Sequence, residues 1–348
     1  MSHSTEQECW QVLPENADPI SQPLVKHQYS ADPSAHVFEG RVYIYPSHDI
    51  DAGIPFNDNG DHFAMCDYHV FSMDEAALNQ LSSTDVQSAV IDHGMALHVD
   101  DVPWAERQMW APDAAHKNGT YYFYFPARNY EGKFQIGVAT AKTPHGPFTA
   151  EPLPIENSYS IDPAVFQDDD DYYMYFGGLW GGQLQEYRNN SFDEKHCEPA
   201  AGETALNPIV AKLADDMKSF AEEPKELVIL DNNGKPFKAD DERRFFEAAW
   251  MHKHNGIYYF SYSTGNHHTI CYATSNSPYG PFTYGGCILE PVLGWTTHHS
   301  ICEMNGKSYL FYHDSTLSEG VTHLRSIKAT PISYDENGKI ITIKPYNA

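Results

Sequence analysis

One pattern recurs five times along this 348-residue chain and constrains its fold more than any other feature. In each copy, a tight turn of Gly, Asn or Asp precedes a short strand of alternating aromatic residues, which is the pattern of a β-hairpin. A second strand-like segment follows each hairpin. The five hairpins end at Tyr45, Tyr124, Tyr175, Ser261 and Tyr312. Five copies of one multi-stranded unit at this spacing predict an all-β, five-bladed β-propeller.

Each repeat also carries one position that is expected at the start of its innermost strand. Counting back 13 or 14 residues from the end of each hairpin leads to this position in all five units. The residues found there are Asp32, Ala111, Asp162, Glu247 and His298. Because the innermost strands of a propeller line one central channel, equivalent positions converge there. The repeat therefore predicts that three carboxyl groups and one imidazole meet in the channel.

The surroundings of Glu247 suggest what such a cluster does. This carboxyl lies between Phe246 and the apolar residues 248–250. Burying an ionised carboxylate among apolar side chains costs free energy, so its pKa should rise, as a general acid requires. The alternative is an ordinary charge at a strand end that reaches water. A proline follows both Asp32 and Asp162 and favours an extended backbone at these residues, so both side chains can project from strand starts.

Length and composition bound the remaining possibilities. The repeats fill the chain as a single propeller domain over residues 29–348, preceded by an N-terminal arm over residues 1–28. The formal charge of −26 argues against nucleic acids and anionic membranes as partners. The six cysteines have no CxxC spacing, which argues against a zinc ribbon or a dithiol redox motif. No signal-peptide pattern and no membrane-spanning run are seen, so we expect a cytoplasmic protein with reduced thiols.

Two features near the expected channel are candidates for its walls. Trp110 precedes the second hub position and is either a stacking surface for a sugar ring or an ordinary core tryptophan. Residues 48–69 form a long insertion after the first hairpin, rich in Asp, Asn, Gly, His and Phe. The insertion lacks the ligand order of a calcium loop. We expect either a rim around the channel mouth or a solvated turn.

With these residues in view, the chain resembles the family 43 glycoside hydrolases over residues 31–325. The matching segments are ADPSAH, WAPDAAHKNGTYYFYF, IDPAVF, FFEAAWMHKHNGIYYFSYS and TTHHSI before NGKSYLFYH. The resemblance implies a five-bladed propeller that cleaves xylan and arabinan side chains and ends. It also implies five roles: Asp32 as general base, Asp162 as the group that tunes pKa and orients, Glu247 as general acid, Arg325 as substrate-positioning group, and His298 as a ligand of a hub cation, directly or through water.

The long loop after PSHD and the TTHHSI segment look most like the single-domain β-xylosidases of the family. We therefore expect an exo-acting, inverting enzyme that releases xylose from xylo-oligosaccharides, with Trp110 and Phe246 as further substrate contacts. Inversion is expected because Asp32 and Glu247 come from distant blades, and carboxyl groups roughly 6.5–9.5 Å apart leave room for a water molecule. The alternatives are an α-L-arabinofuranosidase, a bifunctional xylosidase/arabinofuranosidase, and a sugar-binding propeller without catalysis.

A divalent cation, with calcium favoured, is expected at the hub near His298, because three carboxylates in one narrow channel repel one another. The alternative is that His298 only hydrogen-bonds substrate or a carboxylate, and the sequence does not separate it from its neighbour His299. The C-terminal β-sandwich of other xylosidases in the family is missing. Any wall that it supplies there must come from insertions or from another subunit, which leaves a homo-oligomer open.

Overall fold

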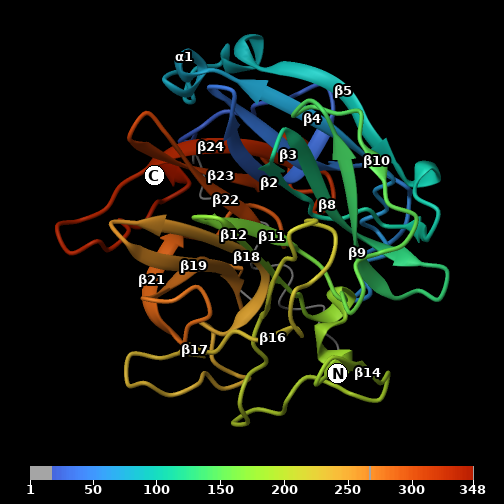
Figure 1. The fold of residues 1–348 in the computed structure, drawn as a ribbon. Helices are drawn as coiled ribbons and strands as arrows, with labels where there is room; N and C mark the ends of the chain where they lie inside the picture. Colours follow the sequence, from blue (N-terminus) through green and yellow to red (C-terminus); the bar gives the residue numbers. More distant parts are fainter. Residues whose placement is uncertain (1–17, 266–267, 348) are drawn as a thin grey trace.

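The computed structural model describes residues 18–265 and 268–347, and nearly all of its regular structure is β-strand (Figure 1). The first three sheets follow one another along the chain. The first comprises β2 (Tyr29–Phe38), β3 (Arg41–Asp49), β4 (Asp67–Met73) and β5 (Ile91–His98). The second comprises β6 (Ala105–Arg107), β7 (Asp113–Lys117), β8 (Thr120–Asn129), β9 (Phe134–Ala141) and β10 (Thr149–Ala150). The third comprises β11 (Ala164–Asp168), β12 (Asp171–Phe176), β15 (Ile209–Lys212) and β16 (Lys225–Glu226).

Two more sheets complete the domain. The fourth comprises β17 (Ile229–Leu230), β18 (Phe245–His254), β19 (Ile257–Thr264), β20 (Ile270–Ser275) and β21 (Phe282–Leu289). The fifth comprises β22 (His299–Met304), β23 (Lys307–Asp314) and β24 (Ser326–Ile332). Short pairs and turns make up the rest: β1 (Asp18–Pro19) with β25 (Tyr346–Asn347), β13 (Tyr187–Arg188) with β14 (Ser191–Phe192), helix α1 (Glu75–Leu78), and 3-10 turns at Val86–Ala89, Val99–Asp101, Trp180–Gly182, Leu184–Glu186 and Thr316–Ser318.

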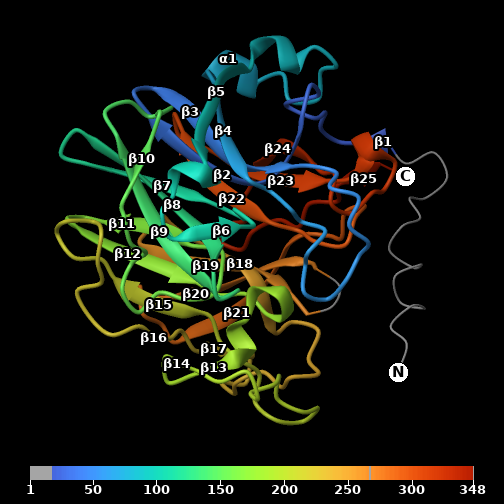
Figure 2. The same cartoon turned by 90° about the vertical axis from the view of Figure 1, so that its right-hand side faces the viewer.

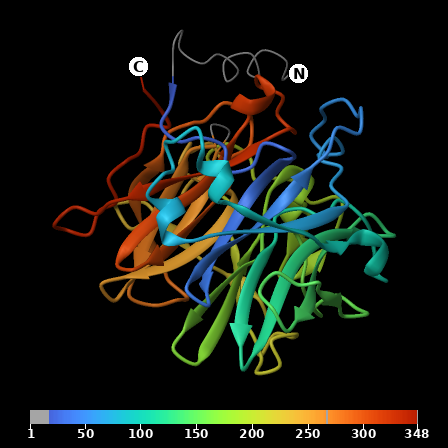
Figure 3. The ribbon, with the colours of Figure 1, turned by 90° about the horizontal axis from the view of Figure 1, so that it is seen from above.

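The innermost strands close a ring. Each contacts the innermost strands of its two neighbours, in the cyclic order β2, β7, β11, β18, β22 and back to β2. Seen from above, the blue strands of the first sheet lie between the red strands of the fifth and the green strands of the second (Figure 3). A closed cycle of five sheets is a five-bladed propeller, so the predicted fold is confirmed.

The predicted hairpins form because their turn residues accept a left-handed backbone. Four of the five hairpins turn through a two-residue loop with positive φ at both positions, and the loops are Glu39-Gly40, Asn118-Gly119, Asn255-Gly256 and Asn305-Gly306. Glycine and asparagine reach these angles at low cost, and the resulting turns match the twist of the paired strands. The third hairpin turns at Asp169-Asp170, so the acidic run 168–171 is a turn, as the repeat predicts.

The tyrosines that end four of the hairpins tie the first three blades each to the next blade and the fifth blade to the segment before β2. Tyr45, Tyr124, Tyr175 and Tyr312 are fully buried. Their hydroxyls bond outside their own sheets, namely to the carbonyl of Pro144, the carbonyl of Met217, the carbonyl of Pro278 and the hydroxyl of Ser21. A buried tyrosine needs a partner for its hydroxyl, and here each partner lies on another segment of the ring. The aromatic repeat therefore supplies both the core and the contacts between blades.

The two ends of the described chain meet. β1 pairs with β25, and Figure 2 shows the two strands side by side. After β1, Leu24 and Val25 are buried in a cluster shared by the first and fifth blades. Residues 1–17 of the predicted arm lie outside the described residues, so the division into an arm and a propeller at residue 28 stays a proposal. Within the described ranges, no helix has the length and apolar character needed to cross a membrane.

Candidate active site

All seven site residues that the sequence predicts line one cavity, at the end of the channel where the innermost strands begin. They are Asp32, Trp110, Asp162, Phe246, Glu247, His298 and Arg325. The backbone is irregular at this end. Asp32 and Asp162 have positive φ values of 51° and 59°, so the extended backbone predicted from the prolines that follow them is wrong, although both side chains do reach the cavity. β18 has register shifts on both sides of Glu247. Bulges re-aim side chains, and left-handed backbone in a non-glycine residue is strain of the kind that gathers at functional sites.

Asp32 is surrounded by hydrogen-bond donors. Its Oδ1 accepts from Arg325 Nη1 at 2.9 Å and its Oδ2 accepts from Ser47 Oγ at 2.6 Å, while its backbone N–H donates to His313 Nδ1 at 3.0 Å. Burial by itself raises the pKa of this carboxyl, but Arg325, His313, His298 and Ser47 together lower it to about 2. Asp32 is therefore a carboxylate at neutral pH, which is the state that a general base requires.

Arg325 is held by a second buried carboxylate. Its Nε and Nη2 donate to the two oxygens of Asp49, at 2.8 and 2.7 Å, and its Nη1 donates to Asp32 and to Thr296 Oγ1. These contacts use four of the five guanidinium N–H groups, so within the described residues one N–H remains for another partner. The guanidinium also lies over the ring of Phe63, 4.8 Å from its centroid. Arg325 is thus fixed in place beside the cavity.

Glu247 and Asp162 form a close pair with raised pKa values. Burial, and then the charge of Asp32, raise the pKa of Glu247 to about 8, against a smaller opposing effect of Arg325. The pKa of Asp162 is raised well above its usual value, by burial and then by the charge of Glu247. Asp162 Oδ2 accepts the backbone N–H of Ala248 at 2.7 Å, and this bond favours its ionised form. This bond opposes the rise in the pKa of Asp162 but does not cancel it, so both carboxyl groups hold a proton more tightly than a free carboxyl group does.

The structure separates the two adjacent histidines. His298 lines the cavity, with Nδ1 at 3.8 Å from both Asp32 Oδ1 and Asp162 Oδ2. Burial lowers its pKa to about 4, so the imidazole is neutral at pH 7. His299 is buried on β22, where its Nε2 lies 2.6 Å from Ser261 Oγ. His298 is therefore the histidine of the channel.

Comparisons with known proteins agree with this geometry. Residues 20–340 match the sequence profile of glycosyl hydrolases family 43. The chain belongs to this family. A xylosidase/arabinosidase 43A of Humicola insolens is 61% identical over 332 residues, which are 93% of this chain and 99% of that protein. A β-xylosidase of Xylanibacter ruminicola is 52% identical and covers 91% of this chain and 97% of that protein.

Solved structures of family 43 members share the fold closely. A β-xylosidase/α-arabinofuranosidase from a compost microbial metagenome, solved with xylotriose in a calcium-free form, has a TM-score of 0.89 at 57% identity and covers 95% of this chain and 100% of its own. A family member from Xanthomonas citri, complexed with xylose, has a TM-score of 0.87 at 58% identity and covers 94% of both chains. The predicted family and its hydrolase class are therefore confirmed.

The walls of the family 43 cavity come from three irregular segments. The insertion between β3 and β4 supplies Asn57, Asp58, Gly60, His62, Phe63 and Met65, so its central part lines the cavity. The segment after β12 supplies residues 179–182, and the segment before β22 supplies Trp295 and Thr296. Trp180 and Trp295 stack on each other, with ring centroids 5.3 Å apart.

Trp110 and Phe246 are both buried, so neither forms an exposed surface on which a sugar could lie. Trp110 is 9% exposed, donates its Nε1–H to the carbonyl of Phe63 and packs against Phe134, while Phe246 is 1% exposed. Trp110 therefore belongs to the core and part of it reaches the cavity, while its role as a stacking surface for a sugar ring stays a prediction. Trp180 is less buried and presents more of its surface.

Sequence reasoning missed four residues that shape this site. Asp49 and His313 hold Arg325 and the backbone of Asp32, and Arg128 and Trp180 build the wall. Nη2 of Arg128 donates to the carbonyl of Asn59 at 3.0 Å and to that of Gly181 at 3.1 Å, which joins the first-blade insertion to the segment after β12. Asp49 could have been noticed in the sequence as the acidic residue that ends the strand of the first hairpin. No periodic pattern marks His313, Arg128 or Trp180.

Proposed function

We propose that the protein is an exo-acting, inverting β-xylosidase that also hydrolyses α-L-arabinofuranosides. The observation that carries the proposal is the contrast between two carboxyl groups in one cavity. Asp32 has a pKa lowered to about 2, and Glu247 has a pKa raised to about 8. Between these values, one group is ionised while the other keeps its proton, as glycoside hydrolysis by a base and an acid requires.

In the proposed reaction, Glu247 donates its proton to the glycosidic oxygen while the bond to the anomeric carbon breaks. Asp32 accepts a proton from the water molecule that attacks this carbon from the opposite face. A single displacement of this kind inverts the anomeric configuration. Arg325 and Ser47 keep Asp32 ionised, and Asp162 holds the backbone N–H of Ala248, the residue after the acid.

The proposed exo action rests on the walls of the cavity. Arg128 joins the insertion at Asn59 to the segment at Gly181, and a Cβ on Gly181 would lie 2.8 Å from the carbonyl oxygen of Asn59. The two segments therefore touch, and they close one side of the cavity. A pocket closed in this way admits a chain end and excludes the middle of a long polysaccharide.

The sugar specificity is drawn from the relatives. Two relatives, of 61% and 56% identity, are named xylosidase/arabinosidase, and a structural neighbour of 57% identity was solved in complex with xylotriose. The two sugars present similar hydroxyls at the reacting ring, so one pocket can accept both. The remaining N–H of Arg325, which is fixed by Asp49, is positioned to meet such a hydroxyl.

We further propose a divalent cation, calcium by preference, beside His298. The donor set fits in part: a neutral imidazole faces two carboxylates at 3.8 Å each. Oxygens of both carboxylates also accept hydrogen bonds from Arg325, Ser47 and Ala248. Since calcium takes 6–8 oxygen ligands, water would have to supply most of them. When bound, such an ion would offset the negative charge of the hub.

The proposal is tested by assaying the chain on aryl β-xylosides, aryl α-L-arabinofuranosides, xylobiose and long xylan, with Asp32→Asn as the matched control variant. We expect turnover of both aryl glycosides, single xylose units from xylobiose, and few internal cuts in xylan. Tight xylo-oligosaccharide binding without turnover would instead identify a sugar-binding propeller. Internal cuts as the main products would overturn the exo assignment.

A further inference from the structure

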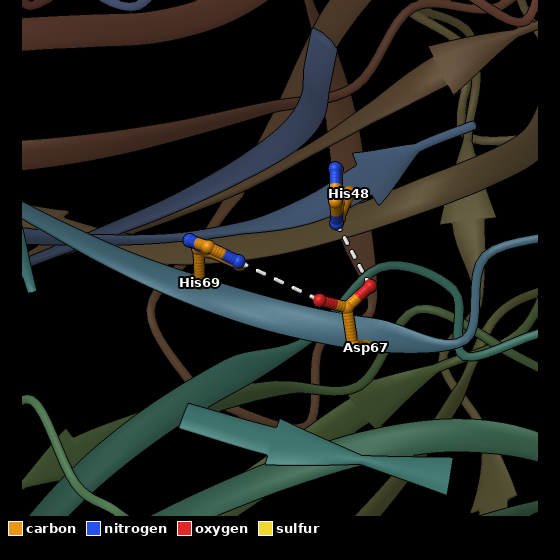
Figure 4. A group of neighbouring side chains, drawn as sticks. All are labelled: His48, Asp67 and His69. Atoms are coloured by element: carbon orange, nitrogen blue, oxygen red, sulfur yellow. Dashed lines mark hydrogen bonds and ion pairs between the residues drawn. The ribbon is translucent and has the colours of Figure 1, made fainter. Parts of the chain in front are cut away.

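Outside the catalytic cavity, three metal-ligating side chains converge on the first blade. His48 lies near the end of β3, and Asp67 and His69 lie at the start of β4. One ligand atom from each of the three lies within 4.8 Å of the other two. Figure 4 shows both imidazoles pointing toward the carboxylate of Asp67. We propose that these residues form a second cation site, which binds a divalent d-block ion such as Zn²⁺ and clamps the base of the insertion.

The distances suit such an ion. His48 Nδ1 lies 2.8 Å from Asp67 Oδ1, and His69 Nε2 lies 3.5 Å from Asp67 Oδ2. Zinc binds nitrogen and carboxylate oxygen at roughly 2.0–2.2 Å, so tetrahedral ligand atoms lie about 3.3–3.6 Å from one another. The two contacts involve different oxygens of Asp67, so its carboxylate would turn to present one oxygen to the ion, and a water molecule would fill the fourth position.

A second carboxylate lies behind one of the imidazoles. His69 Nδ1 faces Asp92 Oδ1 at 3.5 Å, and the other oxygen of Asp92 lies 2.8 Å from His27 Nε2. A metal-bound histidine usually donates its other ring N–H to a carboxylate, which fixes the ring and makes its metal-binding nitrogen more basic. Asp92 would play this part for His69, with the ion on the opposite nitrogen of the ring. This contact is a separate observation from the contacts of Asp67.

The donor chemistry selects the class of ion. Two imidazole nitrogens and one carboxylate oxygen suit zinc, cobalt, nickel or copper, whereas calcium and magnesium prefer oxygen ligands throughout. The side chains of His48, Asp67 and His69 are 22%, 11% and 20% exposed, so an ion can reach them from solvent. This site therefore differs from the hub in both place and preferred metal.

The site lies at the base of the insertion, so an ion bound there would affect the mobility of this loop. His48 and Asp67 lie at the two ends of the insertion 48–69 and enclose residues 49–66, whose central part lines the catalytic cavity. An ion bound to both ends would close this loop at its base and reduce the freedom of the segment. The inference does not rest on the proposed function, because it concerns only the binding of an ion and the mobility of the insertion.

The test uses the full chain, stripped with a chelator and then titrated with Co²⁺, with binding followed by visible absorption. We expect one equivalent, separate from any ion beside His298, that has nitrogen and oxygen donors and is lost in His48→Ala and in His69→Ala. It should persist in His298→Ala, which removes the hub imidazole, and in His254→Ala, which changes a histidine of the fourth blade that stacks on Tyr334. Asp92→Asn should weaken binding roughly 10–100-fold.

Zinc provides a second readout in the wild type and in His69→Ala. Zn²⁺ should slow backbone hydrogen exchange in residues 50–66 of the wild type and leave that of the variant unchanged. Unaltered Co²⁺ stoichiometry and affinity in both histidine variants would overturn the proposal, as would an intense thiolate-to-cobalt band. No binding by the wild type would also overturn it and would leave an ordinary His–Asp–His hydrogen-bond network.

Discussion

The proton that Glu247 retains should control the alkaline limb of the pH–rate profile. As the proposed general acid, Glu247 works only when protonated, and its pKa is raised from 4.5 to about 8 by burial and by Asp32. The profile of kcat/KM reports the pKa values of the free enzyme. We therefore expect the rate to fall above pH 8, with the acidic limb set by Asp32 at much lower pH.

The size of this effect follows from the pKa. With a pKa of about 8, about nine-tenths of the enzyme carries the proton at pH 7 and about one-tenth at pH 9. The value of kcat/KM on xylobiose should therefore fall about tenfold between these two pH values. With an unshifted pKa of 4.5, only about 0.3% of the enzyme would be protonated at pH 7. The environment of Glu247 thus raises the active fraction roughly 300-fold.

The assay compares Glu247→Gln with Glu303→Gln, which changes an exposed glutamate on β22. Glu247→Gln should lose roughly 10²–10⁴-fold on xylobiose, but far less on aryl xylosides whose acidic leaving groups need little protonation. Its profile on aryl xylosides should lack the limb near pH 8, whereas Glu303→Gln should keep it. Equal losses on both substrates, or an unchanged alkaline limb in Glu247→Gln, would refute the assignment of Glu247 as the acid.

Three further predictions concern the same cavity. Asp32→Asn should lose roughly 10²–10⁴-fold on every substrate whatever its leaving group, because water activation is always needed; selective loss on xylobiose would contradict this. The pKa of Glu247 is higher in the folded than in the unfolded protein, so the wild type loses stability as the pH rises from 4.5 toward about 8. In thermal melts, Glu247→Gln should therefore be more stable than the wild type at pH 9 and nearly as stable at pH 4. Arg128→Lys should raise KM for xylobiose several-fold with kcat nearly unchanged, because lysine cannot bridge Asn59 and Gly181 together; a fall in kcat at constant KM would contradict this.

The sequence predicted what is local or repeated. Each hairpin is set by a turn and an alternating strand, and both signals lie within about ten residues. The equivalence of the repeats then brought Asp32, Asp162, Glu247 and His298 together without any knowledge of distances. Ring closure makes this inference sound, because five similar units around one axis place equivalent residues in one channel.

Contacts between segments that are distant in the chain could not be predicted, because neither a local pattern nor the repeat marks them. The pairing of Arg325 with Asp49 spans 276 positions, and it forms only when the fifth blade closes against the first. The bridge from Arg128 to Gly181 joins two irregular loops, whose paths no periodicity describes. His48 and Asp67 meet because β3 pairs with β4, so their grouping follows from the register of the sheet and not from their spacing in the chain.

The central claim is that Asp32 activates a water molecule and Glu247 protonates the leaving group in a single displacement. Proton NMR of the sugar first formed from a β-xyloside tests it most directly, since the anomeric signals are read before mutarotation mixes them. With a single displacement, α-xylose should appear first and β-xylose should grow in later. Initial release of β-xylose would contradict it, because retention requires a carboxylate that attacks the anomeric carbon itself.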